Sequence, residues 1–334
     1  MAFITSSSKP SPTIFQTLDR ALKLLCQSSP LSFPLLLFSI LTSSLLFISN
    51  FLSVAPIAKD LLSKLLPFFS HHHPSPFGPD FPKQIAAIIS DARRLAAAQS
   101  PFSIAAFSLS LLLLIAAVHA FSAAYTGEPL TLPSLLQKIK IRWYQTLITQ
   151  LYILILTIGF AVVSSAVIAS VHLWENSPLV DGISGSLFTA AASLYIYLRS
   201  RWWLSLVITV VEKKETYGIG ALSWAVELFY NNVRRGMTIT VLDLAGAGTI
   251  AAGYFVAMGS AREDLEMQIK ITSLTAAAGV VWGTVITAVY TVFYFECRES
   301  FSSAVDGMGY GFSWEKLRPL RIGAGSSGMT AIDV

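Results

Sequence analysis

Charged side chains are scarce in this chain of 334 residues, because Asp, Glu, Lys and Arg together make up only 13% of it. A soluble protein carries about 25%, so too few charges are present to cover a soluble domain of this size. Hydrophobic residues reach 54%, which indicates that lipid covers much of the surface. The composition excludes a water-soluble globular enzyme and a disordered chain. Two cysteines are too few for a secreted disulfide scaffold.

Motifs of known enzyme chemistry are also missing. No G-x-S-x-G, H-E-x-x-H, Walker or kinase motif occurs, so we expect no enzyme, no catalytic residue and no cofactor. A G-x-G-x-x-G match at Gly323 lacks the flanking strand and helix of a dinucleotide site. The adjacent His71, His72 and His73 have no acid or Cys at ligand spacing, which favours a solvated loop over a metal site. The net charge of +4 without a basic stripe predicts no nucleic-acid partner.

Long apolar runs are the main feature that is present. A bilayer core of about 30 Å needs roughly 20 apolar residues in a helix. Six runs reach or approach that length, so the sequence predicts an all-α integral membrane protein whose partner is the lipid bilayer. The predicted spans are residues 31–54, 102–125, 147–173, 183–201, 237–259 and 271–295.

The fourth span differs from the others because Arg199 and Arg201 interrupt it. In one straight helix these two charges would lie near mid-membrane, at about 2.5–3.5 kcal/mol each. We therefore expect a broken element that ends near Arg201, with the apolar residues 202–211 at the membrane interface.

The distribution of Lys and Arg predicts the topology. With six spans both termini lie on one side, and 16 of the 23 Lys and Arg fall on that side. The positive-inside rule then places both termini in the cytosol, in the endomembrane system or the plasma membrane. We expect a disordered cytosolic tail over 1–13, a membrane domain over 14–299 and a cytosolic C-terminal tail over 300–334. A non-cytosolic loop over 55–100 would hold two surface helices around a Pro-rich stretch.

Three cytosolic segments have amphipathic patterns that are typical of helices lying along a membrane surface. Residues 14–27 place Ile14, Leu18 and Leu22 on one face, away from Asp19 and Lys23. Residues 132–143 and 220–235 repeat the pattern. Each of the three segments precedes a span that runs from the inside to the outside.

The chain resembles two families in short patches. The run from Trp202 through Gly236 (WWLSLVITVVE, then YGIGALSWAVELFYNNVRRG) resembles the membrane-anchor family of glycerophosphodiester phosphodiesterases. AAYTGEPLTL and VYTVFYFECRESF are similar to a group of uncharacterised plant multi-pass transmembrane proteins. The resemblance implies a six-helix membrane domain, and it does not imply phosphodiesterase activity. The family-pattern positions are Glu212, Gly218, Ala221, Leu222, Arg235 and Gly236.

Asp243 is the most informative single residue, because an acid inside a predicted span is costly and usually faces the bundle interior. One interpretation is a proton or cation site. The other, which we favour, is a structural ion pair with Arg199 or Arg201 at the same depth.

Small residues and cysteines suggest contacts at two further places. Gly279 and Gly283 form a G-x-x-x-G motif that is typical of close helix packing, either between spans 5 and 6 or in a homodimer. Cys26 and Cys297 fall at the predicted cytosolic interface, where S-palmitoylation takes place, and an unmodified buried thiol is the alternative.

Three functions remain open from the sequence. The first is a non-enzymatic multi-pass membrane protein that organises or associates with other membrane components. The second is a small-solute or ion transporter with a site between spans 4 and 5. The third, a lipid-modifying enzyme using Glu212, Glu215 and Glu227, is disfavoured because exposure on helix surfaces explains those acids better.

Overall fold

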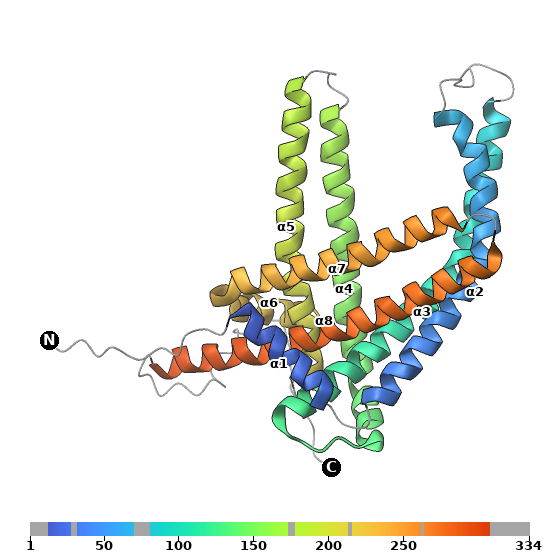
Figure 1. The fold of residues 1–334 in the computed structure, drawn as a ribbon. Coiled ribbons are helices and arrows are strands. Elements are labelled where there is room, and N and C mark those ends of the chain that lie inside the picture. The colour runs from blue at the N-terminus through green and yellow to red at the C-terminus, as the bar shows by residue number, and fades with distance from the viewer. Residues whose placement is uncertain are drawn as a thin grey trace, which may run out of the picture.

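The computed structural model describes residues 13–27, 32–69, 81–172, 178–212, 216–261 and 264–307. Within these ranges the chain is helical and contains no strand (Figure 1). The elements are α1 (Ile14–Gln27), α2 (Ser32–Phe69), α3 (Phe81–Thr126), α4 (Leu132–His172), α5 (Pro178–Val211), α6 (Ile219–Phe229), the 3-10 turn η1 (Tyr230–Asn232), α7 (Val233–Ser260) and α8 (Leu265–Gly307).

Five helices are long and apolar enough to cross a membrane, and they contain predicted spans 1, 2, 3, 5 and 6. The apolar stretches are Phe33–Leu65, Pro82–Thr126, Leu132–Val167, Val233–Ser260 and Leu265–Ser302. The fourth predicted span lies in α5, which is not among these five. The predicted all-α membrane fold is therefore supported with five spans, and the sixth stays a prediction.

α5 is one continuous helix of 34 residues, so the predicted break near Arg199 and Arg201 is wrong. The physical reason is that both arginines find partners without leaving the helix. Arg199 pairs with Asp243 of α7, and Arg201 places its guanidinium 4.1 Å from the ring centre of Tyr197. These contacts offset the cost that led us to expect a break.

The segments on either side of the Pro-rich stretch are helical, as predicted. Residues 55–69 continue α2 and residues 81–100 begin α3, so these two helices extend past predicted spans 1 and 2. The side of the membrane on which they lie stays a prediction. Lys64 of α2 joins the two helices by binding the buried Asp91 of α3 at 2.5 Å and Asp60 at 2.9 Å. Residues 70–80, which include the three histidines, lie outside the described residues, as do the tails 1–12 and 308–334.

The amphipathic segments are helical, in two cases as parts of longer elements. α1 has the predicted bounds 14–27, whereas 132–143 is the beginning of α4 and 220–235 covers α6, η1 and the start of α7. α1 packs on α8, α3 and α7 through Thr17, Ala21 and Leu24, while Leu22 is 52% exposed. The packed face is therefore rotated from the predicted one, because a polar contact of Thr17 and Arg20 with Glu296 orients the helix.

The core lies where the second half of α8 passes α5 and α6. Phe229, Tyr290, Phe293 and Tyr294 are fully buried there, and Trp203 stacks on Tyr290 with ring centres 5.3 Å apart. Beyond this core α4 and α5 run off as a pair, while α7 and α8 take a different direction (Figure 1). The helices thus converge at one end of the molecule and separate at the other.

Candidate functional site

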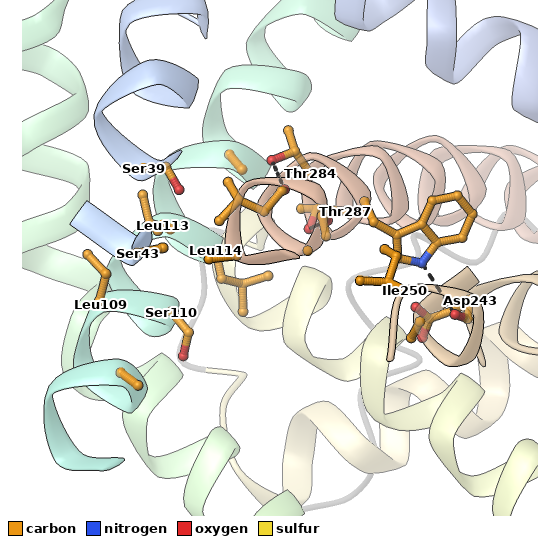
Figure 2. Close-up of a pocket in the computed structure, with 18 of the residues that line it drawn as sticks. Ser39, Ser43, Leu109, Ser110, Leu113, Leu114, Asp243, Ile250, Thr284 and Thr287 are labelled. Atoms are coloured by element: carbon orange, nitrogen blue, oxygen red, sulfur yellow. Dashed lines mark hydrogen bonds between the residues drawn. The ribbon is translucent and has the colours of Figure 1, made fainter. Parts of the chain in front are cut away.

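A cavity of about 870 Å³ lies among the separating helices (Figure 2). Six long helices line it, namely α2, α3, α4, α5, α7 and α8. Figure 2 shows that Ser39 and Ser43 of α2 lie near Leu113 of α3 at one side, while Asp243 lies at the other. We refer to this space as the central cavity.

The Arg199–Asp243 pair forms the charged part of the cavity wall. Two nitrogens of Arg199, Nη2 and Nε, donate to Oδ2 of Asp243 at 2.8 and 3.2 Å, and Nη1 donates to the hydroxyl of Tyr195 at 3.1 Å. Trp282 Nε1 donates to the backbone carbonyl of Asp243 at 3.3 Å. The side chain of Asp243 is 6% exposed. The ion-pair interpretation of Asp243 is therefore confirmed, with Arg199 as its partner.

Arg201 does not join this site. It lies on Tyr197 and 5.9 Å from the ring centre of Phe229, and it is not among the residues that line the cavity. The two arginines are two positions apart in a helix, which turns them to different faces. Of the two arginines that the sequence offered as partners of Asp243, Arg201 is therefore not the one that pairs with it.

Uncharged polar groups complete the wall. Hydroxyls such as those of Ser110, Thr157 and Thr284 donate to carbonyls of the preceding turn in their own helices. Oε1 of Gln150 is buried and has no hydrogen-bond partner among the described residues. Gln150 could not be predicted as a lining residue, because a single glutamine in an apolar run has no special meaning until its neighbours in space are known.

The cavity is open at its side toward the outer surface of the molecule. Phe47 of α2 and Phe255 of α7 line it and are also 50% and 72% exposed. Both side chains are apolar, and each belongs to a helix that is apolar enough to cross a membrane. The opening therefore faces the region that lipid chains would occupy around such helices.

The family-pattern residues lie at the corner between α5, α6 and α7. Gly218 has a φ of +59°, which favours glycine, and its N–H donates to Thr149 Oγ1 at 2.8 Å. Glu212 accepts a 2.6 Å hydrogen bond from the hydroxyl of Tyr294. Ala221 is fully buried, and the N–H of Leu222 donates to the carbonyl of Gly218. These positions form packing contacts between helices rather than a binding site.

The acids considered for lipid chemistry do not form a recognisable site. Glu212 is bound to Tyr294 and lies 3.8 Å from Arg298. Glu227 is exposed on α6, and Glu215 lies outside the described residues. Among the described residues no group of three or more His, Cys, Asp or Glu could hold a metal ion.

A second buried charge cluster joins α1, α7 and α8. Glu296 accepts hydrogen bonds from Thr17 at 2.9 Å and from Arg20 at 2.8 Å, and it also pairs with Arg235. Its side chain is only 2% exposed. Gly236 follows Arg235, and a Cβ there would lie 2.1 Å from the ring of Phe229. The sequence reasoning missed Glu296, although an acid directly after an apolar span was the available signal.

In the part of the chain that the structure describes, the small-residue motif does not mediate helix packing. A Cβ added at Gly279 or Gly283 would meet no atom within 4 Å, because both residues line the central cavity. Contact between α7 and α8 instead uses Gly246, where a Cβ would lie 2.1 Å from the ring of Trp282. The prediction that Gly279 and Gly283 pack span 6 on span 5 is therefore wrong, and the homodimer stays a prediction.

The two cysteines differ in what the structure describes. Cys297 is fully buried in protein, so its thiol is not presented for S-palmitoylation and the alternative of a buried thiol holds. The side chain of Cys26 lies outside the described residues, and its acylation stays a prediction.

An all-helical chain with five helices able to cross a membrane, and a cavity among them, belongs to the class of multi-pass membrane proteins. Residues 13–309 match the family model described as "Domain of unknown function (DUF8558)", and the chain belongs to this family. No curated protein and no solved structure matches it. The resemblance to the phosphodiesterase membrane-anchor family and to plant proteins stays a prediction.

Proposed function

We propose that this protein is a non-enzymatic membrane protein that associates with other membrane components by binding a membrane-soluble molecule in the central cavity. The observation that carries this proposal is the cavity itself. Its volume of about 870 Å³ is within the range of roughly 300–1,000 Å³ that ligand sites occupy. Its apolar lining, few polar groups and side opening suit a molecule that arrives from the lipid.

The charges of the cavity support binding without a chemical step. Among the described residues that line the cavity, Arg199 and Asp243 alone carry a formal charge, and they are paired with each other. General acid–base catalysis needs a group that is available to exchange a proton with a substrate. A carboxylate fixed by two N–H groups of an arginine is poorly placed for that role.

The arrangement in the membrane is part of the proposal. We place α5 across the bilayer as the sixth span, because its 34 residues extend about 50 Å at 1.5 Å per residue and its Arg199 is neutralised. Both termini then lie in the cytosol, together with α1, the start of α4 and α6 at the membrane surface. The bias of Lys and Arg supports this orientation, and it leaves open the endomembrane system or the plasma membrane.

A small-solute transporter with its site between α5 and α7 is the second candidate. It is supported by one observation, namely that Arg199 and Asp243 line a cavity rather than a closed packing contact. An ion is the less suitable cargo, because the pair has no net charge with which to bind it. Protein partners or a homodimer through α7 and α8 would be compatible with either function.

Filling the cavity tests the proposal. The wild-type protein in phosphatidylcholine vesicles is irradiated with three probes, namely photoreactive hexadecanol, palmitic acid and hexadecylamine with identical diazirine-bearing chains. Labelled peptides are then mapped by mass spectrometry. At least one probe should label the lining segments of α3 and α8, and Gly279→Phe should reduce this labelling at least about fivefold, because its side chain enters open space in the cavity.

The matched control is Gly253→Phe, which also meets no atom within 4 Å but does not line the cavity. It should leave the labelling unchanged. Equal loss in both variants, or the absence of labelling in the lining segments with all three probes, would contradict the proposed binding.

A further inference from the structure

We propose that the central cavity selects an uncharged amphiphile, with a head that both donates and accepts hydrogen bonds, such as a hydroxyl, and an apolar body. This inference rests on the proposed function and adds the chemical class of the ligand to it. It comes from the charges, the unpaired acceptors and the apolar surface of the cavity.

The charges of the lining favour a neutral ligand. The charges of Arg199 and Asp243 cancel, and no other lining residue in the described part of the chain carries a formal charge. A charged head group in this cavity would lose its water and find no uncompensated opposite charge. A neutral head group avoids that cost, so the cavity discriminates against carboxylates and ammonium groups alike.

The hydrogen-bond inventory of the wall favours a head group that can donate. Both nitrogens of Arg199 that reach Asp243 use Oδ2, and Oδ1 accepts no hydrogen bond from a described residue. Oε1 of Gln150 is a second acceptor without a donor. Of these two acceptors, Oε1 of Gln150 is buried, and a buried acceptor is costly to leave unpaired. A ligand hydroxyl can supply the missing donor.

The same wall also offers donors to the oxygen of the head group. The Arg199 guanidinium has five N–H groups, of which the described residues accept three, at Asp243 and Tyr195. A hydroxyl donates one hydrogen bond and accepts others. A hydroxyl can therefore donate to the unpaired acceptors and accept from Arg199. A head group that only accepts or only donates cannot do both.

The rest of the lining suits an apolar body. Aromatic and aliphatic side chains from all six helices line the cavity. They include Phe47, Leu113, Ile153, Trp203, Phe255 and Val280. The surface extends from the Arg199–Asp243 pair toward the side opening at Phe47 and Phe255. The head would lie against the pair, and the body would point toward the lipid.

The three hexadecyl probes test the class of the ligand, because they share one chain and differ only in the head group. We expect hexadecanol to label the cavity at least about tenfold more efficiently than palmitic acid or hexadecylamine at equal membrane concentration. That preference corresponds to about 1.4 kcal/mol. Equal or stronger labelling by either charged probe would overturn the inference and leave the proposed binding intact. No labelling by any probe would remove both.

Variants that change the charge of the cavity provide a second test of the ligand class. Asp243→Asn leaves Arg199 unpaired, so palmitic acid should gain labelling relative to hexadecanol. Arg199→Gln leaves Asp243 unpaired, so hexadecylamine should gain instead. Asp91→Asn is the matched control, since it removes a buried carboxylate that is paired with a lysine outside the cavity. If the preferences did not move in opposite directions in the two cavity variants, or moved in the control, the charge argument would be wrong.

Discussion

Replacing Glu296 by Gln should be among the most damaging single changes in this protein. The carboxylate is 2% exposed and holds Arg235, whose side chain is 14% exposed. Removing one partner of a buried ion pair typically costs about 3–5 kcal/mol. Gln can still accept from Thr17, so we place the loss near the lower limit, at about 3 kcal/mol of the free energy of unfolding.

Arg20 and Arg235 should contribute unequally to the free energy of unfolding. Arg20 is 51% exposed, and water screens its interaction with Glu296, so Arg20→Ala should cost no more than about 1 kcal/mol. Arg235→Met should cost about 2–3 kcal/mol, because Arg20 remains to compensate the acid only in part. The double variant Glu296→Met with Arg235→Met should cost less than the sum of the two single changes.

The measurement is the free energy of unfolding from titration with a denaturing detergent, followed by tryptophan fluorescence and circular dichroism. Glu266→Gln is a suitable control, because this acid pairs with Lys270 at an exposed position and should change stability by less than about 0.5 kcal/mol. The reasoning would be refuted if Arg20→Ala cost as much as Arg235→Met, or if Glu296→Gln behaved like the control.

Two further predictions concern packing. Gly246→Ala should destabilise the protein by about 1–3 kcal/mol, because the new Cβ would lie 2.1 Å from the ring of Trp282. Gly279→Ala should stay within about 0.5 kcal/mol of the wild type. Equal effects of the two changes in the same detergent titration would contradict the assignment of Gly246 to the α7–α8 contact. In a Cys26→Ser background, Cys297 should react with a membrane-permeant maleimide only after denaturation, because it is fully buried, and rapid labelling of the folded protein would show the thiol to be accessible.

Much of the fold follows from local sequence. Five predicted spans lie in helices that can cross a membrane, because an apolar run of that length has few alternatives to a helix in lipid. The helix over 14–27 was likewise predictable from its pattern. The length of the helices was not, because α2 and α3 continue through charged residues on either side of the Pro-rich stretch, where Lys64 and Asp91 join the two helices.

The candidate site was only partly predictable. The cost of an acid in an apolar span pointed to Asp243 and to an arginine of the fourth span as its partner, and Arg199 is that partner. The choice between Arg199 and Arg201 depends on the rotation of α5 against α7, which spacing along one chain does not encode. The same limit applies to Gly279, whose motif predicted packing while the angle between the helices leaves it facing a cavity.

The layer next to the Arg199–Asp243 pair bears on the choice between binding and transport. Ser200, Thr240 and Tyr290 are fully buried and form a chain of hydrogen bonds from α5 through α7 to α8. None of these three residues lines the cavity, so the layer lies in the direction of the packed core, next to the Arg199–Asp243 pair. A solute crossing the protein in that direction would have to break the chain of hydrogen bonds and part three helices, whereas a lipid-soluble molecule can enter and leave through the side opening. These contacts support the proposed binding from the membrane over the transporter alternative.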